Sequence, residues 1–197
     1  MSRNTSNNHI KFSFLLIVTL LIINSCHTRE EREIRQMIGQ SIDIDGNFVY
    51  MDSSQVYQLI PNEKPIKVMT FIDYNECYEC MFKPLLGLEV IFTKNQIKSD
   101  DINILAFVDS IDTTKAQDLL KKMHLTRTIL VTDSAGYYLE NNNLEKLLHR
   151  NRTFILDKNN EIVFMGNPVI NYTLQTYFCE ILSNLSRNNG IFKVEKK

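Results

Sequence analysis

The sequence predicts an α/β domain with a mixed central sheet flanked by helices. Through the middle of the chain, short apolar runs rich in β-branched residues alternate with segments of helical periodicity. A strong hairpin signal and a last amphipathic segment follow toward the C-terminus. Strands that alternate with helices favour parallel pairing, and the hairpin adds an antiparallel part, so a mixed sheet is expected.

The composition is that of one globular domain with additional segments. The chain has 197 residues, of which 44% are hydrophobic and 23% charged, so it can bury one good core. Its formal net charge is −1, and its basic residues are scattered among acidic ones. Because phosphate binding needs clustered Lys and Arg, nucleic acid is excluded as a partner.

The first half of the domain begins with weak signals and then becomes regular. Residues 38–61 contain short apolar alternations and a turn at 45–47, which predict a small strand or hairpin. The apolar run Ile66–Asp73 predicts a buried strand. In Met81–Gln96 the apolar residues recur at helical spacing, so this segment is expected to be the first long helix.

A second cycle of strand, helix and strand follows. Ile102–Val108 is expected to be a buried strand, Thr114–Met123 an amphipathic helix and Thr128–Thr132 a third strand. The polar connection 133–149 is expected to hold a short helix at 144–148.

The C-terminal part predicts a hairpin and a closing helix. Thr153–Leu156 and Ile162–Met165 flank the turn residues 157–160. The helix Tyr172–Leu185 is expected to point these residues inward: Leu174, Tyr177, Phe178, Ile181 and Leu185. Cys179 lies on the same apolar face and is expected to be a buried free thiol. The polar tail 188–197 is expected to fray.

The N-terminus has the pattern of an export signal. Basic residues precede the apolar stretch Phe12–Ile23, which is shorter than the roughly 20 residues that span a bilayer. The following residues, Ile23-Asn24-Ser25-Cys26, resemble the lipobox of bacterial lipoproteins, although Asn24 departs from its commonest form. This resemblance implies a signal peptide over 1–25 and an acylated Cys26.

Acylation at Cys26 implies a place in the cell. The protein would be lipid-anchored to a bacterial membrane in the cell envelope, on the periplasmic side or at the cell surface. The charged residues 26–37 are then expected to be a tether to a domain over 38–187. The alternative is an ordinary cleaved signal peptide with an incidental cysteine.

The candidate working site is the pair Cys77 and Cys80. The pair follows a predicted buried strand and opens a predicted helix, a context that favours redox chemistry. Near a helix N-terminus, unpaired N–H groups and the helix dipole stabilise a thiolate. Cys80 lies one turn further on, where it can resolve a mixed disulfide.

From about Ile66 to Leu185 the chain resembles thioredoxin-like proteins of the TlpA and peroxiredoxin-related type. The segments that carry the resemblance are IKVMTFIDYNECYEC, INILAFV, TILVTD and TFILDKNNEIVFMG. The resemblance implies that Cys77 attacks a disulfide and that Cys80 resolves the intermediate. It also implies that the partners are protein thiols and disulfides of the envelope, and that no cofactor or metal is needed.

The chain departs from the family around the cysteine pair. Glu76 stands where Trp is usual, and Tyr78-Glu79 replace Gly-Pro. Like-charge repulsion from the two glutamates disfavours a nearby thiolate. Because a stabilised reduced form is what makes a strong oxidant, we expect a reductase or disulfide carrier instead.

Other departures affect the expected docking surface and the proton supply. Asn151 or Arg152 stands where the family has a cis-proline, and a cis bond without proline costs about 2.5–4 kcal/mol. Phe71 falls where some relatives have a buried Asp, and it cannot move protons. Pro84 resembles the helix proline of the family, one residue early.

Three other interpretations of the cysteine pair remain open. The chain could be a redox-inactive thioredoxin-like binding module of an envelope protein complex. The pair could also be a static disulfide or half of a metal site, but no second Cys pair or His pair at zinc-ligand spacing is visible. A peroxidase is disfavoured, because the Pro-x-x-x-Thr/Ser-x-x-Cys pattern of peroxiredoxins precedes neither cysteine.

Overall fold

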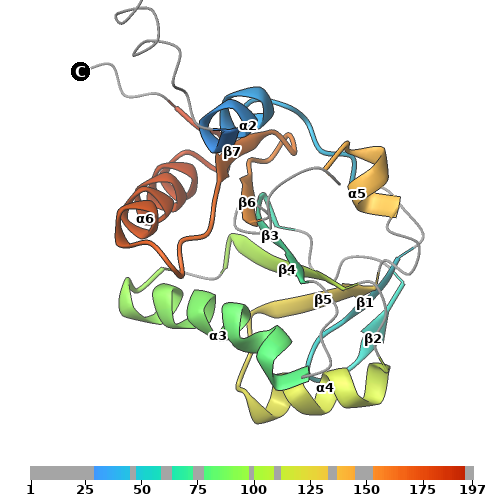
Figure 1. The fold of residues 1–197 in the computed structure, drawn as a ribbon. Coiled ribbons are helices and arrows are strands. Elements are labelled where there is room, and N and C mark those ends of the chain that lie inside the picture. The colour runs from blue at the N-terminus through green and yellow to red at the C-terminus, as the bar shows by residue number, and fades with distance from the viewer. Residues whose placement is uncertain are drawn as a thin grey trace, which may run out of the picture.

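The computed structural model describes residues 29–44, 48–58, 64–72, 78–97, 100–108, 112–132, 137–144 and 153–193. These residues form a seven-stranded sheet with helices on both faces (Figure 1). The strands are β1 (Val49–Met51), β2 (Val56–Tyr57), β3 (Ile66–Ile72), β4 (Ile102–Val108), β5 (Thr128–Thr132), β6 (Thr153–Leu156) and β7 (Ile162–Met165). The helices are α2 (Arg29–Met37), α3 (Tyr78–Lys94), α4 (Thr113–Lys122), α5 (Tyr137–Asn141) and α6 (Tyr172–Arg187).

The sheet is mixed, as the sequence predicts. Its strand order is β2-β1-β5-β4-β3-β6-β7. The central strands β3, β4 and β5 are parallel, whereas β6, β7, β1 and β2 add antiparallel pairs on either side. The three central strands are almost fully buried, because helices cover both of their faces.

The core lies on both faces of the sheet. On one face α2 and α5 cover an aromatic cluster in which the rings of Phe107 and Tyr138 have centroids 4.3 Å apart. On the other face α3, α4 and α6 cover two further hydrophobic clusters, which are largely aliphatic but contain several phenylalanines. Strand β3 shows the division directly: Met69 and Phe71 face the aromatic cluster, and Val68 and Ile72 face α3.

The charged segment before the domain is partly helical. Residues 29–37 of the expected 26–37 tether form α2, whose last residue Met37 is buried against the aromatic cluster. Helix α2 therefore contributes to the core. The part of the expected signal peptide and tether before Arg29 lies outside the described residues. Among the residues that are described, no helix is both long and apolar enough to cross a membrane.

Several boundaries differ from the sequence-based expectations. The first long helix begins at Tyr78, three residues before the expected start, and contains Pro84 in its second turn. A short helix between β5 and β6, α5 at 137–141, was not predicted. All of the short helix expected at 144–148 except Leu144 lies outside the described residues, so it stays a prediction. The expected turn at 45–47 also lies outside it.

Helix α6 and the tail differ in two further respects. The expectation that Tyr177 points inward is wrong, because its side chain is 55% exposed, while the buried face of α6 carries Phe178, Leu182 and Leu185. The tail does not fray at once after the helix. Gly190 donates a backbone hydrogen bond to Leu185 at 2.8 Å, and the Asn184 side chain bonds the backbone of Lys193.

Candidate functional site

Cys80 lies in the first turn of α3, just beyond the carboxyl end of β3. It is the third residue of the helix, its side chain is exposed, and it is disulfide-bonded. The other described cysteine, Cys179, is free, so the partner of Cys80 lies outside the described residues. Because α3 begins at Tyr78, the prediction that the cysteine pair opens a helix is confirmed for Cys80.

The strand end next to α3 carries a buried pair of hydroxyl groups. Thr70 in β3 and Thr153 at the start of β6 are direct cross-strand partners, and their Oγ1 atoms are 3.0 Å apart. The backbone N–H of Gly166 donates to the carbonyl oxygen of Thr153 at 2.9 Å. The loop 166–171 between β7 and α6 therefore lies at the same end of the sheet as the start of α3.

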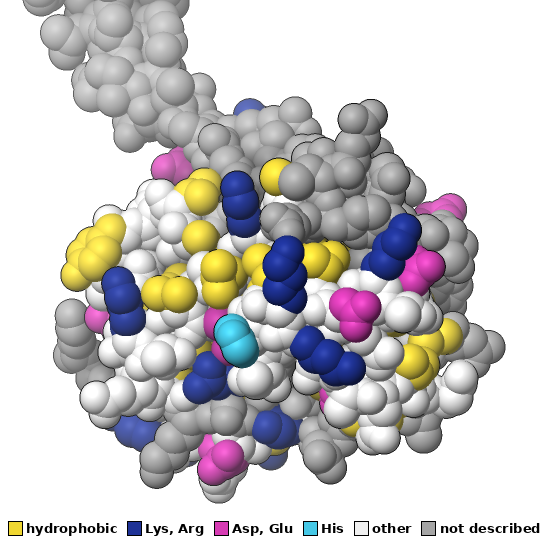
Figure 2. All heavy atoms as spheres, turned by 90° about the horizontal axis from the view of Figure 1, so that it is seen from below, with side chains coloured by type: hydrophobic (Ala, Val, Ile, Leu, Met, Phe, Trp, Pro, Cys, Tyr) yellow, Lys and Arg dark blue, Asp and Glu magenta, His cyan; other side chains and the backbone are white. Residues whose placement is uncertain are grey.

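This loop packs directly against α3. A Cβ atom added at Gly87 would lie 2.9 Å from Val169 Cγ2, so only glycine lets the loop approach the helix this closely. The contact brings together four exposed apolar residues, which we call the apolar rim: Leu86, Val90, Val169 and Ile170. Figure 2 shows hydrophobic side chains in a row across the face of the molecule that contains α3 and α4.

Phe71 occupies the position expected for a buried acid beneath the site. It stacks on Phe107, with ring centroids 5.0 Å apart and an angle of 25° between the ring planes. It also makes an edge-on contact with Phe154, at 6.0 Å between centroids. The position is thus part of the aromatic core and offers no group that can accept a proton.

Several predicted site residues lie outside the described part of the chain. These are Cys26, Cys77, Glu76, Asn151 and Arg152, and the side chain of Glu79 is also outside it. The roles predicted for them stay predictions. The described residues contain no group of three metal-binding side chains.

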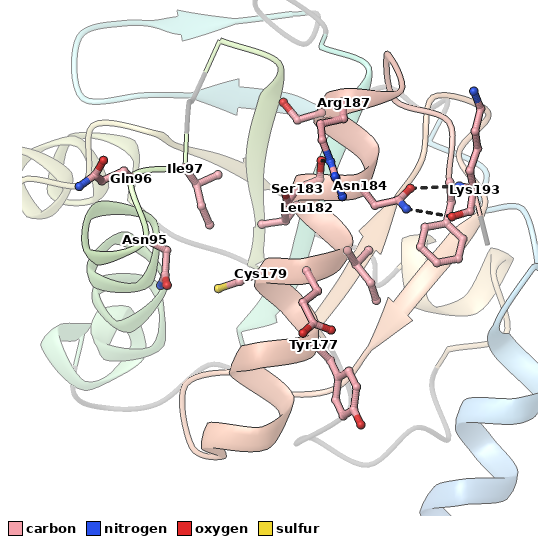
Figure 3. A pocket seen from close by; sticks show the side chains of 14 residues that line it. Asn95, Gln96, Ile97, Tyr177, Cys179, Leu182, Ser183, Asn184, Arg187 and Lys193 are labelled. Carbon is pink, nitrogen blue, oxygen red and sulfur yellow. Dashed lines mark hydrogen bonds between the residues drawn. The ribbon is translucent and has the colours of Figure 1, made fainter. Parts of the chain in front are cut away.

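The third cysteine has a different environment. Cys179 is half-buried on α6, and burial, helped by the charge of Glu180, raises the pKa of its thiol. Its sulfur points toward the end of α3, into a groove of about 1050 Å³ between α3, α6 and the tail (Figure 3). A thiol with a raised pKa is a poor nucleophile at neutral pH. The groove was not predicted, because it forms only when the tail folds back onto α6.

The fold is similar to that of several solved structures. A provisionally assigned electron transfer protein from Aquifex aeolicus VF5 has a TM-score of 0.54 and 16% identity, over 74% of this chain and 97% of that one. A PrxQ mutant from Xylella fastidiosa has a TM-score of 0.51 and 17% identity, over 77% and 96% of the two chains. A provisionally assigned protein disulfide isomerase from Bacteroides thetaiotaomicron has a TM-score of 0.50 and 12% identity, over 78% and 99%.

Sequence comparison adds nothing to these matches: no family model and no curated protein matches the chain. At these identities the structural matches establish the fold alone. Together with the sheet order, they show that the chain has a thioredoxin-like fold, of the type that thiol–disulfide oxidoreductases use.

Proposed function

We propose that the chain is a thiol–disulfide oxidoreductase that acts through Cys77 and Cys80. The observation that carries the proposal is the exposed, disulfide-bonded Cys80 in the first turn of α3. Structural disulfides are usually resistant to reduction, whereas exposed ones are more often labile, regulatory or catalytic. The thioredoxin-like fold supports the same chemistry.

The assignment of Cys77 as the partner of Cys80 rests on elimination and spacing. The chain has four cysteines, and Cys179 is free. If Cys26 is acylated, its sulfur is already bonded to lipid. Cys77 precedes Cys80 by three residues, a spacing typical of redox-active pairs.

In the proposed reaction the Cys77 thiolate attacks a disulfide of a substrate protein. A mixed disulfide forms and the first substrate sulfur leaves as a thiolate. The Cys80 thiolate then attacks the Cys77 sulfur, which closes the Cys77–Cys80 disulfide and releases the second substrate sulfur. The substrate gains two electrons, and a dithiol partner must reduce the pair again. Glu76 and Glu79 favour this reducing direction, because their charges oppose thiolate formation.

The apolar rim supports a protein as the substrate. Val169 is 37% exposed and Ile170 is 70% exposed, at the end of the sheet where α3 begins. Clustered exposed apolar side chains on the helix that carries Cys80, and on the loop packed against it, suit an apolar polypeptide segment. We further propose that an acylated Cys26 holds the protein on a bacterial membrane, as the lipobox resemblance implies.

A redox-inactive binding module is the second candidate function. Phe71 favours it, because it leaves no proton acceptor at the position where some relatives have a buried acid. In that case a partner would still bind the apolar rim, but the cysteines would not exchange electrons with it.

The two functions are separated by equilibrating the full chain with graded dithiol buffers and counting alkylated thiols by mass. We expect Cys77 and Cys80 to titrate together as one two-electron couple, with Cys179 as an unchanged internal reference. The Cys77→Ser variant should lose reductase activity toward a protein disulfide. A pair that stays oxidised in strong reductant, together with partner binding unaffected by Cys77→Ser, would establish the binding module instead.

A further inference from the structure

We propose that the end of the molecule opposite Cys80 rests on the membrane surface, so that the disulfide faces away from the bilayer. The proposal rests on the proposed acylation of Cys26 but not on the redox chemistry. It assigns the substrates to a class: proteins that reach the site from the aqueous side, not disulfides at the bilayer surface.

The hairpin turn between β6 and β7 joins three segments at this end. Lys158 donates a backbone hydrogen bond to Gly190 of the tail at 2.9 Å. The chain after α2 bonds the same hairpin, since Gly39 donates to Ile162 at 2.8 Å and Ile42 donates to Asn160 at 2.9 Å. The end of α2, the hairpin turn and the tail therefore form one continuous surface, which we call the hairpin-end surface.

The hairpin-end surface combines apolar and basic side chains. Its exposed apolar residues are Ile38 at 43%, Ile191 at 36% and Phe192 at 36%. Lys158 and Lys193 are exposed beside them, whereas Glu161 is an exposed acid on the same turn. Apolar side chains with adjacent lysines suit the interface of an anionic bilayer.

The tail is held firmly enough to present these side chains. The Asn184 amide donates to the carbonyl oxygen of Lys193 at 2.8 Å and accepts from its backbone N–H at 3.0 Å, as the dashed lines in Figure 3 show. Asn184 is itself buried, at 8% exposure. A buried amide that bonds both backbone groups of Lys193 fixes the path of the chain from 188 to 193.

The length of chain before α2 brings this surface to the membrane. From Cys26 to Arg29 the chain can span at most about 11 Å. Helix α2 has nine residues and is therefore about 14 Å long. An acylated Cys26 thus lies within about 25 Å of the hairpin-end surface, and the domain cannot move far from the bilayer.

Cys80 lies beyond the other end of β3. A Cβ atom at Gly190 would be 2.8 Å from that of Pro65, which precedes the first residue of β3. Cys80 comes after the last residue of β3. The seven residues of this strand span about 20 Å. Figure 1 shows the same separation, with α2 on the side of the molecule away from the start of α3.

Lysine footprinting tests the orientation. The mature full-length protein, purified with its lipid, would be inserted into vesicles of phosphatidylcholine with phosphatidylglycerol and treated with a water-soluble amine-acylating reagent. Compared with protein in detergent, we expect several-fold lower labelling of Lys158 and Lys193. Lys83 and Lys121 lie exposed on α3 and α4 and should be labelled equally in both. Equal labelling of all four lysines would overturn the proposal.

A matched pair of variants tests the apolar contribution. Phe192→Ser should restore labelling of Lys158 in vesicles, whereas Tyr172→Ser, an exposed aromatic at the site end, should not. Loss of protection in both variants, or in neither, would contradict the assigned surface. An intact mass without acyl chains would also overturn it, by removing the anchor. The thiol titration of the same sample would still report whether the redox pair works.

Discussion

At the scale of single residues, Thr128 carries a buried hydroxyl group that affects the stability of the fold. Its hydroxyl is inaccessible at the start of β5 and has no hydrogen-bond partner among the described residues. The adjacent Arg127 is well satisfied, because its side chain bonds Glu89 at 2.7 Å and its backbone N–H bonds the same carboxylate at 2.9 Å. An unsatisfied buried hydroxyl costs about 1–3 kcal/mol.

Replacing Thr128 with valine should therefore stabilise the protein. We expect Thr128→Val to raise the free energy of unfolding in urea by about 1 kcal/mol. Thr153→Val is the matched control, because it removes a hydroxyl that is bonded to Thr70 at 3.0 Å. It should lower the free energy of unfolding by a similar amount, since the Thr70 hydroxyl would then lack its partner. Equal effects of the two substitutions would contradict this explanation.

Asp52 makes stability depend on acid pH. Partial burial acts to raise the pKa of Asp52, but it is outweighed by hydrogen bonds from the side chains of Ser54 and Tyr57 and from the backbone of Ser54 and Gln55. The result lowers the pKa from 3.8 to about 2. A carboxylate with a lowered pKa stabilises the fold above pH 3.8 and loses this effect as the pH falls through about 2.

We expect the β1–β2 hairpin, where Asp52 lies, to weaken between pH 4 and pH 2. Over this range the free energy of unfolding should fall more steeply with decreasing pH for the wild type than for Asp52→Asn, whose side chain cannot titrate. The difference should be small, because the carboxylate is only partly buried. If the free energies of unfolding of the two proteins changed in parallel with pH, the hydrogen bonds to Asp52 would not stabilise its ionised carboxylate.

At the scale of elements, Gly87 determines how the loop before α6 meets α3. Glycine inside a helix normally costs about 0.5–1 kcal/mol relative to alanine. Here an alanine side chain would overlap Val169. The close approach of the loop explains why a glycine stands in the third turn of an otherwise apolar helix.

A double-mutant cycle measures this contact. Gly87→Ala alone should leave the free energy of unfolding unchanged or lower it, because the gain in helix propensity is offset by the clash. In the Val169→Ala background the same substitution should stabilise by about 0.5–1 kcal/mol, the normal gain for alanine over glycine in a helix. Stabilisation of the same size in both backgrounds would rule out the clash.

At the scale of the whole molecule, the two faces of the sheet depend on helices from both ends of the chain. Helix α2 precedes β1 and covers the aromatic cluster, while α6 covers a largely aliphatic cluster on the other face. The two termini of the fold also meet at the hairpin between β6 and β7. Part of the charged segment predicted to be a tether therefore packs on the domain as α2.

The role of α2 is testable with neighbouring residues. Met37 is 7% exposed and Ile38 is 43% exposed. Met37→Ala should lower the free energy of unfolding by about 2 kcal/mol, the smaller end of the range for buried methionine. Ile38→Ala should change it by less than about 0.5 kcal/mol in the absence of membrane. If both substitutions changed the free energy of unfolding by less than about 0.5 kcal/mol, α2 would not contribute to the core, and the prediction of a tether over 26–37 would stand.

Local sequence patterns were enough to predict the fold class, the three central strands, the hairpin and the closing helix. Each of these has a local cause: β3, β4 and β5 are continuous apolar runs because both of their faces are buried, and the turn at 157–160 carries its own turn residues. The position of Cys80 in a helix that follows a buried strand was predicted on the same local basis.

The remaining features depend on contacts between distant segments, so no local sequence pattern predicts them. Helix α2 contacts the aromatic cluster through two apolar side chains, Ile34 and Met37. Its other residues are charged or polar, so its sequence alone does not predict a helix that packs on the core. Tyr177 lies outward because the face of α6 that packs on the sheet carries Phe178 and Leu182. The groove beside Cys179 exists because Asn184 binds the tail. The order of apolar and polar residues along the chain predicts which segments form helices and strands. Which residues those elements contact depends on packing between segments that are distant in the sequence.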